Sequence, residues 1–200
     1  RGKPTAAGTY NFSLKATRSN GCTGTRAYTI TVSGGAMTAL ARTADYDGDG
    51  KSDLSLWSGA TGRWQIVRSG DEQTATPEWG GAGDVTLLGD YDGDGQSDLA
   101  VFRPSSGTWF VQRSGDGTAL VQAWGVATDV PVPGDYDGDG QTDLAVWRPS
   151  EGNWYVLQSS DGSYQSKSWG LGRAPYLDVP VPGDYDGDGV TDLAVFRRQT

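Results

Sequence analysis

Four short segments of the chain place aspartate at one fixed spacing, D-x-D-G-D-G-x-x-D. They span residues 45–53, 90–98, 135–143 and 184–192. Carboxylates at positions 1, 3, 5 and 9 of such a loop, with a backbone carbonyl at position 7, supply the hard oxygen ligands that Ca²⁺ prefers. Glycines at positions 4 and 6 allow the positive φ that a tight wrap around an ion requires. The pattern therefore predicts one Ca²⁺ site in each loop, about four in all.

The expected ligands follow from this spacing. The carboxylates are those of Asp45, Asp47, Asp49, Asp53, Asp90, Asp92, Asp94, Asp98, Asp135, Asp137, Asp139, Asp143, Asp184, Asp186, Asp188 and Asp192. Position 7 is occupied by Lys51, Gln96, Gln141 and Val190. Because these four side chains share no chemistry, we expect position 7 to bind the ion through its backbone carbonyl.

Two other interpretations of the loops fit the residues less well. An EF-hand needs a bidentate Glu at position 12. That position holds Leu56, Val101, Val146 and Val195. The second interpretation is a set of Asp-Gly turns without metal, but four carboxylates so close together repel one another strongly unless a cation neutralises them.

The negative charge of the chain is concentrated in these loops. The formal net charge is −9, and 16 of the 25 acidic residues belong to the four loops. Such a chain is suited to binding cations, and its acidity disfavours nucleic acid and anionic membrane surfaces as partners. No apolar stretch approaches the roughly 18 residues of a membrane-spanning helix, so we expect no membrane insertion.

The sequence carries no signature of a catalytic site. It has no His and only one Cys, which removes His-dependent triads, His-ligated zinc and any internal disulfide. It also has no G-x-S-x-G, Walker or dinucleotide-binding motif. Paired aspartates can hydrolyse glycosides, but every such pair here falls inside a loop. We therefore predict that the protein is not an enzyme.

The loops mark an internal repeat, because they begin 45, 45 and 49 residues apart. Aromatic residues keep the same phase. Twelve residues after each first Asp come Trp57, Phe102, Trp147 and Phe196. Nineteen residues after it come Trp64, Trp109 and Trp154, and thirty-four residues after it come Trp79, Trp124 and Trp169. The chain thus contains three full repeats and the start of a fourth.

Within each repeat, short apolar runs alternate with Gly- and Ser-rich turns, which predicts four β-strands per repeat and no helix. Residues 98–104, 107–114 and 119–125 are the first three strands of one repeat. The segments 130–135 and 179–184, just before the later loops, would be fourth strands. Their prolines lie two residues apart, so the missing N–H groups face one side, and we expect these strands at a sheet edge.

The phased tryptophans have two possible roles. Trp64, Trp109 and Trp154 alternate with apolar residues, which favours packing between blades over a sugar-stacking surface. Trp79, Trp124 and Trp169 each precede Gly and are expected at a rim. Arg103 and Arg148 each precede Pro, and we expect them to pair with loop carboxylates rather than to bind a ligand.

The N-terminal stretch has a different pattern. Residues 8–33 form two alternating segments around a Ser-Asn-Gly turn, which predicts a β-hairpin that is marginal on its own. It resembles the last two strands of a bacterial immunoglobulin-like domain. We expect a partial immunoglobulin-like segment at 1–35 and the repeats at 36–200. Cys22, near the turn, would either cross-link chains or remain a free thiol.

Residues 45–200 resemble FG-GAP-type (VCBS-type) repeats, which are the blades of integrin α-subunit propellers and of related bacterial and fungal proteins. The resemblance implies four-stranded blades in which each Asp loop joins the first two strands and holds a structural Ca²⁺. Propellers of this kind close with about seven blades, whereas this chain has about three and a half. The blades are therefore expected to stay open or to be completed by other chains.

Two functions remain open on the sequence. The first is a secreted, calcium-binding structural protein of bacterial origin, which associates with copies of itself through open β edges into a surface or filament assembly. The second is a glycan- or protein-binding adhesion domain, similar to a lectin, within a larger cell-surface protein. Both place the protein outside the cell or at its surface, where millimolar calcium would suit loops of modest affinity.

Overall fold

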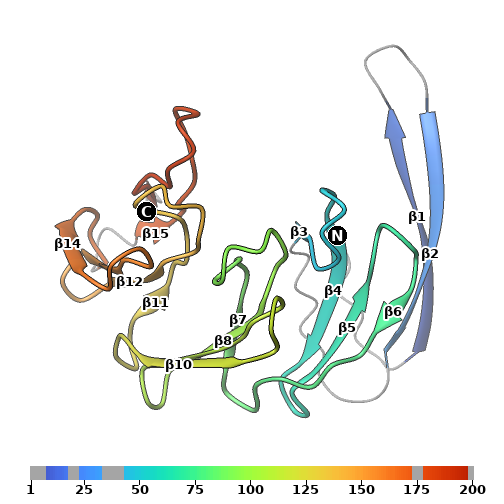
Figure 1. Cartoon of the computed structure of the whole chain (residues 1–200), viewed down its shortest axis with the longest axis horizontal. Coiled ribbons are helices and arrows are strands. Elements are labelled where there is room, and N and C mark those ends of the chain that lie inside the picture. The colour runs from blue at the N-terminus through green and yellow to red at the C-terminus, as the bar shows by residue number, and fades with distance from the viewer. Residues whose placement is uncertain (1–7, 18–22, 33–42, 173–177, 198–200) are drawn as a thin grey trace.

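The computed structural model describes residues 8–17, 23–32, 43–172 and 178–197, and every element in these ranges is a β-strand. The expected all-β fold is thereby confirmed. Within the same ranges, no helix is long and apolar enough to cross a membrane. Figure 1 shows the strands gathered into separate small sheets that stand side by side along the chain.

Three of the sheets are four-stranded and antiparallel, as expected for propeller-type blades. Blade 1 consists of β3 (Thr43–Ala44), β4 (Asp53–Ser58), β5 (Arg63–Val67) and β6 (Thr74–Ala75). Blade 2 consists of β7 (Val85–Leu87), β8 (Leu99–Arg103), β9 (Thr108–Gln112) and β10 (Ala119–Ala123). Blade 3 consists of β11 (Val130–Pro131), β12 (Leu144–Arg148), β13 (Asn153–Leu157) and β14 (Tyr164–Ser168).

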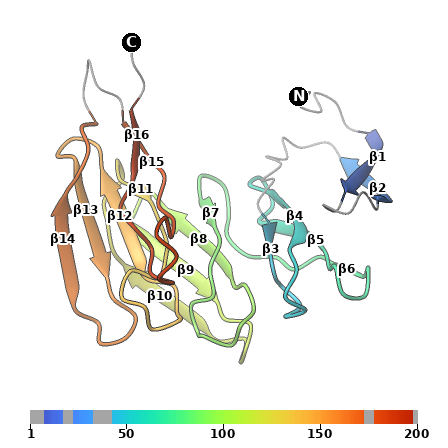
Figure 2. The same cartoon turned by 90° about the horizontal axis from the view of Figure 1, so that it is seen from above.

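Two further sheets have two strands each. The half-blade consists of β15 (Asp178–Pro180) and β16 (Val195–Arg197), and the N-terminal hairpin consists of β1 (Gly8–Thr17) and β2 (Thr23–Val32). In two perpendicular views the hairpin lies at one end of the molecule, and the half-blade lies beside blade 3, away from the hairpin (Figures 1 and 2).

The core lies between the blades, because the second strand of a blade is covered on both faces. In β8, Ala100, Val101 and Phe102 are completely buried. Phe102 packs with Leu144 and Val146 of blade 3, whereas Val101 packs toward blade 1. This explains why the second strands are continuous runs of apolar residues. In the third strands, by contrast, buried residues alternate with half-buried ones, as in β9.

The phased tryptophans of the third strands are the largest side chains of this core. Trp64, Trp109 and Trp154 are at most 1% exposed. Each lies beside the aromatic residue directly opposite on the second strand, as in the pair Phe102–Trp109, whose ring centroids are 5.6 Å apart. The expected packing role is confirmed for these residues.

The proline-containing segments lie at sheet edges, as expected. β11 contains Pro131, is the outermost strand of blade 3 and pairs only with β12. The segment is the first strand of the blade that follows, however, and not the fourth strand of the repeat that precedes it. Val132 donates its amide to Ala145 at 2.8 Å, so the pairing crosses the loop and ties the segment to the next repeat.

The N-terminal stretch forms the expected hairpin, with β1 and β2 paired over their full length from Gly8 opposite Val32 to Thr17 opposite Thr23. The turn, Cys22 and the expected boundary near residue 35 lie outside the described residues. The immunoglobulin-like origin of the hairpin and the division at residues 35 and 36 remain predictions.

Candidate metal sites

Each Asp loop connects the first strand of a blade to the second, for example β7 to β8 across residues 90–98. The glycines at positions 4 and 6 have positive φ in all four loops, as in Gly93 (78°) and Gly95 (85°). The expected loop conformation is therefore present in every repeat.

The first aspartate of each loop organises the backbone around it. In the second loop, Asp90 accepts the amide of Gly93 on Oδ1 at 2.7 Å and that of Gly95 on Oδ2 at 2.8 Å. The same two hydrogen bonds recur on Asp45, Asp135 and Asp184. These bonds curl the loop so that the carboxylates at later positions turn toward the same centre.

The ninth-position aspartate anchors the loop to the blade. Asp98 is completely buried, and its carboxylate accepts amides from Tyr91 and Ser114 at 2.7 Å each. Burial raises the pKa of Asp98 above its ordinary value of 3.8, although these hydrogen bonds oppose the change. Burial likewise raises the pKa of Asp143. A buried carboxylate of this kind is stabilised by a nearby cation.

Three carboxylates converge in each loop, with one oxygen from each lying within 4.8 Å of the others. The groups are Asp45, Asp47 and Asp53; Asp90, Asp92 and Asp94; Asp135, Asp137 and Asp143; and Asp184, Asp186 and Asp192. Such sets of oxygen donors fit a hard divalent cation such as Ca²⁺. The sequence predicted four carboxylate ligands per loop, and the structure brings three together.

The fourth expected carboxylate of each loop is not part of these groups. Asp98 makes the buried hydrogen bonds described above, whereas Asp49, Asp139 and Asp188 accept the amide of the residue two positions later at 2.8 Å. In the second loop that bond is made by Gln96 to Asp94.

The backbone amide at position 7 therefore donates to the carboxylate at position 5 in every loop. The donors are Lys51, Gln96, Gln141 and Val190. Lys51 also contacts Asp49 through its ammonium at 2.7 Å, and this hydrogen bond lowers the pKa of Asp49. The metal-binding role of the position-7 carbonyls remains a prediction.

Sequence reasoning missed a serine that ties each of the first three loops to the end of the third strand. The hydroxyl of Ser114 donates to Asp94 at 3.1 Å and to Asp98 at 2.9 Å. Ser69 and Ser159 make equivalent contacts with Asp49 and Asp139. All three serines lie 24 residues after the first Asp of the loop, so their constant phase in the repeat could have revealed them.

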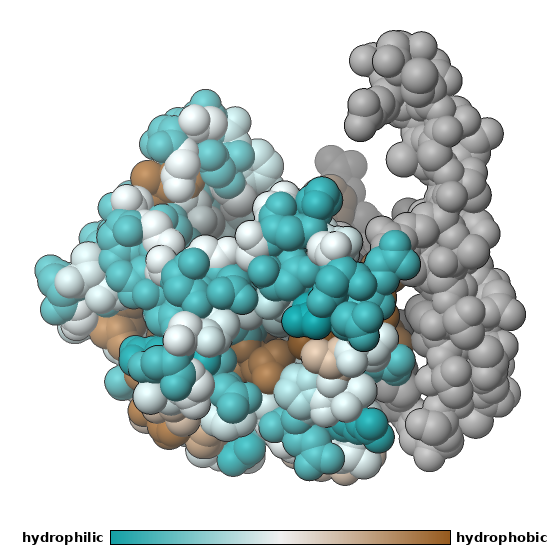
Figure 3. Space-filling view, turned by 45° about the vertical axis from the view of Figure 1, so that its right-hand side comes forward, coloured by the Kyte–Doolittle hydropathy of each residue, from teal (hydrophilic) through white to brown (hydrophobic). Residues whose placement is uncertain are grey.

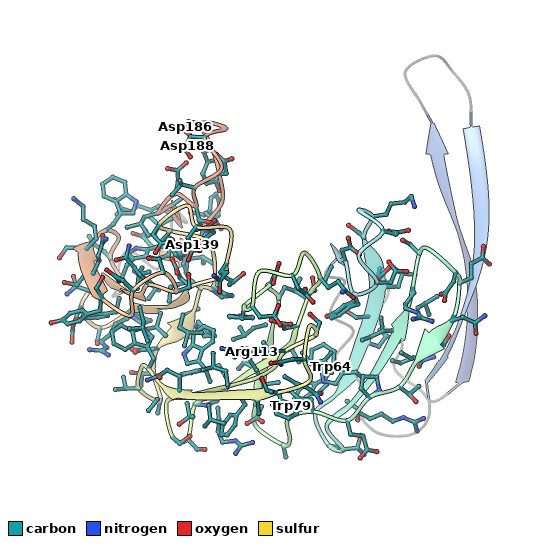
Figure 4. The ribbon with its side chains drawn as sticks, in the orientation of Figure 1. Trp64, Trp79, Arg113, Asp139, Asp186 and Asp188 are labelled. Atoms are coloured by element: carbon teal, nitrogen blue, oxygen red, sulfur yellow. The ribbon has the colours of Figure 1, made fainter. Side chains whose placement is uncertain are left out.

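Neighbouring loops also touch one another. The amides of Ser97, Thr142 and Thr191, at position 8, donate to the backbone carbonyls of Asp45, Asp90 and Asp135, the first residues of the preceding loops, at 2.5, 2.7 and 2.6 Å. The four loops thus form a connected row. Figure 4 shows Asp186 and Asp188 projecting at the tip of the last loop, with Asp139 on the neighbouring one.

The expected pairing of Arg103 and Arg148 with loop carboxylates is wrong. Arg103 forms two hydrogen bonds with Asp84, at 2.8 and 2.9 Å, and Arg148 binds Asp129 in the same way. Arg197 repeats this contact with Asp178. The acidic partners lie six residues before each loop, at the start of a blade's first strand, and strand pairing brings them beside the arginine at the end of the second strand.

The tryptophans expected at a rim have another role in the first two blades. The indole N–H of Trp79 donates to the carbonyl of Phe110 at 3.1 Å, and that of Trp124 donates to Tyr155 at 3.3 Å. Each bond reaches from one blade to the third strand of the next. In Figure 4, Trp79 and Trp64 lie on the side of the molecule away from the tip of the last loop.

The surface is mainly hydrophilic on the face drawn in Figure 3, where hydrophobic residues form small separate patches. A groove of about 270 Å³ lies between blades 2 and 3. Polar side chains on its walls include Arg113, Gln122 and Gln158.

Comparison with known proteins identifies one family. The model of FG-GAP-like repeats matches residues 90–146 and 135–195, which together make up just over half of the chain. No curated protein and no solved structure matches the chain. The matched segments each contain two successive Asp loops and the strands between them.

Proposed function

Because the chain belongs to the family of FG-GAP-like repeats, we propose that it is a calcium-stabilised structural module of the extracellular space or cell surface. It acts without catalysis and associates with copies of itself through open β edges. Repeats of this family are typically non-catalytic and occur in extracellular and surface proteins. The proposal combines that family assignment with the chemistry of the loops.

The observation that carries the calcium role is the convergence of carboxylates at the same place in all four loops. Three oxygens within 4.8 Å of one another repel strongly. A bound Ca²⁺ would remove that repulsion and add to the free energy of folding. The buried ninth-position aspartates and the serines join the loop to the blade, so ordering of the loop would also hold the blade's strands in place.

Self-association is supported by exposed edge strands of the complete blades, such as β14 at the edge of blade 3, whose five residues are all exposed. The edge strand of a sheet presents unpaired N–H and C=O groups, to which a strand of another chain can pair. Contacts between two different edges of a molecule repeat head to tail, which produces open chains unless the rotation closes a ring. A filament or a surface layer is the expected product.

The test is the mass of the full chain by light scattering, together with its thermal unfolding, in millimolar calcium and after chelation. Large assemblies in calcium are expected. If the dissociation constant lies tenfold below the calcium concentration, each site should add about 1.4 kcal/mol to the free energy of unfolding. A chain that stays monomeric at every calcium concentration would rule out self-association. An unfolding temperature that does not change with calcium concentration would rule out the metal role.

The groove between blades 2 and 3 favours a second candidate function, adhesion through a glycan or a surface protein. Its volume of about 270 Å³ is near the lower limit of small-ligand sites, and guanidinium and amide groups suit hydroxyl-rich ligands. Binding of the calcium-loaded chain to a glycan array, with loss of binding in Gln122→Ala, would support this alternative.

A further inference from the structure

We propose that the groove between blades 1 and 2 binds a small organic anion, about the size of one sugar acid, whose carboxylate is held by Arg68 and Arg113. This site is distinct from the groove between blades 2 and 3. The inference goes beyond the proposed structural function and does not depend on self-association.

Two guanidinium groups line this groove, which has a volume of about 220 Å³. Arg68 directly follows the third strand of blade 1, and Arg113 directly follows the third strand of blade 2. Arg113 is labelled in the middle of the row of blades in Figure 4. Among the described residues that line the groove, none is acidic. On a chain with a formal net charge of −9, the groove therefore concentrates positive charge, which favours an anionic ligand.

Arg113 belongs to none of the ion pairs between described residues. By contrast, Arg103, Arg148 and Arg197 each donate Nε and a terminal nitrogen to one aspartate, at 2.8 to 3.0 Å. The Nε atom of Arg113 is buried and has no acceptor within the described part of the chain. A buried donor without an acceptor costs free energy. A carboxylate bound along this edge of the guanidinium would supply the acceptor.

A difference between two equivalent turns leaves Arg113 without an ion pair. In blade 1, Arg68 donates to Asp71, three residues later, at 2.7 Å. The equivalent acid of blade 2 is Asp116, which instead accepts the amide and the hydroxyl of Thr118, at 2.9 and 2.7 Å. The guanidinium of Arg113 is therefore available to a ligand in the groove.

The blade fold does not require arginine at this position of the repeat. Arg68 and Arg113 lie 23 residues after the first Asp of their loops, and Gln158 has the same place in blade 3. Blade 3 has four strands like the other two, and Gln158 accepts the hydroxyl of Ser163 at 2.7 Å. The two arginines are therefore not explained by folding alone, and glutamine is a substitution that the repeat itself accommodates.

The rest of the groove suits the uncharged part of an organic anion. Ala75, Pro77 and Leu99 supply half-buried apolar surface, and Ser97 supplies a hydroxyl. Small-molecule sites commonly combine apolar walls with a few polar groups that fix the orientation of the ligand. The volume of about 220 Å³ lies just below the usual range of about 300–1,000 Å³. A ligand of the size of one sugar acid is therefore expected, rather than a peptide segment.

The groove is joined to the first two Asp loops, because Tyr46 of one and Ser97 of the other line it. The amide of Ser97 also donates to the carbonyl of Asp45, which connects the two loops. The carboxylates of calcium-free loops would repel an anion in the groove, and bound Ca²⁺ would remove that repulsion. The anion should therefore bind more tightly to the calcium-loaded chain, and it should raise the calcium affinity by the same factor.

Calorimetric titration of the full chain in millimolar calcium tests the site. The probes are glucuronate, glucose as its uncharged match, and inorganic sulfate as a free anion. We expect glucuronate to bind, sulfate to bind more weakly and glucose not to bind. Glucose binding as tightly as glucuronate would overturn the role of the charge, and sulfate binding as tightly would overturn an organic ligand. If neither anion binds, the proposed site does not exist, and the calcium role and self-association, which are measured without these probes, are unaffected.

Substitutions locate the site. Arg68→Gln and Arg113→Gln, which imitate blade 3, should each weaken glucuronate binding by about tenfold or more, because each removes a charged donor. Gln122→Ala is the matched control, because Gln122 lines the groove between blades 2 and 3 but not this one. Arg113 lines both grooves, so Arg68→Gln is the variant that distinguishes them. Binding lost in Gln122→Ala and retained in Arg68→Gln would overturn the inference.

A gain of binding separates ligand contact from damage to the fold. Asp71→Asn releases Arg68 from its ion pair, so we expect it to strengthen glucuronate binding by up to about fivefold, the scale of an exposed pair. Thermal unfolding of the two Arg→Gln variants should match that of the wild-type chain. Glucuronate binding that is unchanged in Arg68→Gln and in Asp71→Asn would mean that Arg68 does not contact the ligand, and would overturn the site as proposed.

Discussion

The backbone amide of Thr142 donates a 2.7 Å hydrogen bond to the backbone carbonyl of Asp90, and the two residues belong to neighbouring loops. The Thr142 hydroxyl accepts the amide of Asp90 in return, at 3.1 Å. Asp90 is at the same time the residue that curls its own loop. An ion that orders one loop therefore also fixes a hydrogen-bonding partner of the next.

Calcium binding to neighbouring loops should be positively cooperative. Asp92→Asn removes one converging carboxylate from the second loop, which lies between two others. We expect calorimetric titration to show one fewer bound ion and a binding midpoint for the remaining loops that is higher by roughly fivefold, the scale of ordinary coupling between sites.

Asp186→Asn is the matched control, because its loop contacts only the preceding loop among the described residues. Its effect on the remaining sites should be smaller. If Asp92→Asn removes one ion and leaves the midpoint of the others unchanged, the loops are independent despite their contacts.

The loops and blades could be predicted because they depend on local chemistry that recurs. Asp at fixed spacing with Gly at positive φ determines the loop whatever surrounds it, and alternating Trp and Val determine the third strand. The arginine partners could not be predicted in the same way. Asp84 and Arg103 are 19 residues apart, and only the pairing of β7 with β8 brings them together. The sequence favoured the loop carboxylates as partners, because they lie nearer to the arginines along the chain, and that prediction was wrong.

The carboxylates that converge differ from one loop to another. Position 9 was expected to bind the ion in every loop. It belongs to the converging group in three loops, whereas Asp94 takes that place in the second loop, and the ligands of the ion remain a prediction. Spacing along the chain does not distinguish these two carboxylates. The hydrogen bonds do not distinguish them either, because Asp53 and Asp143 accept the equivalent two amides as Asp98 does.

The stability of the calcium-free chain should rise on mild acidification. Burial raises the pKa of Asp98 and Asp143 above the unfolded value of 3.8. The folded chain therefore holds these protons more tightly than the unfolded chain does, and unfolding becomes less favourable as pH falls through the folded-state pKa values toward 3.8. Denaturant unfolding between pH 7 and pH 4.5, after removal of calcium, measures this.

The calcium-loaded chain should behave in the opposite way, because protons compete with the ion for the carboxylates. Asp98→Asn should flatten the pH dependence of the calcium-free chain. A calcium-free chain that loses stability steadily from pH 7 downward would contradict the expectation, and would mean that the hydrogen bonds to these aspartates outweigh their burial.

Trp124→Phe should weaken the contact between blades 2 and 3. The change keeps an aromatic ring but removes the N–H that donates to Tyr155, so we expect a loss of about 1 kcal/mol in the free energy of unfolding. Trp169→Phe, measured at a concentration where the chain is monomeric, should change this free energy very little. Equal losses in the two variants would show that ring packing, and not the hydrogen bond, determines the effect.

Gly107 should tolerate no side chain. It lies in the turn directly before β9 with φ of 62°, and a Cβ atom there would overlap the carbonyl oxygen of Gly125, two residues beyond the end of β10. Gly117 has a similar φ of 69°, but nothing lies within 4 Å of its Cβ position. Gly107→Ala therefore adds a backbone clash to the cost of left-handed φ, whereas Gly117→Ala has that cost alone.

The left-handed conformation costs about 1–2 kcal/mol for Ala, and a clash with rigid backbone adds about 1–3 kcal/mol. We expect denaturant unfolding to show a loss of about 1 kcal/mol for Gly117→Ala and about 3 kcal/mol or more for Gly107→Ala. Gly62 and Gly152 approach the carbonyls of Gly80 and Gly170 in the same way, so Ala at either position should reproduce the larger loss. Similar losses for Gly107→Ala and Gly117→Ala would mean that the left-handed φ alone explains why position 107 requires glycine. They would also mean that the third and fourth strands can separate at little cost in free energy.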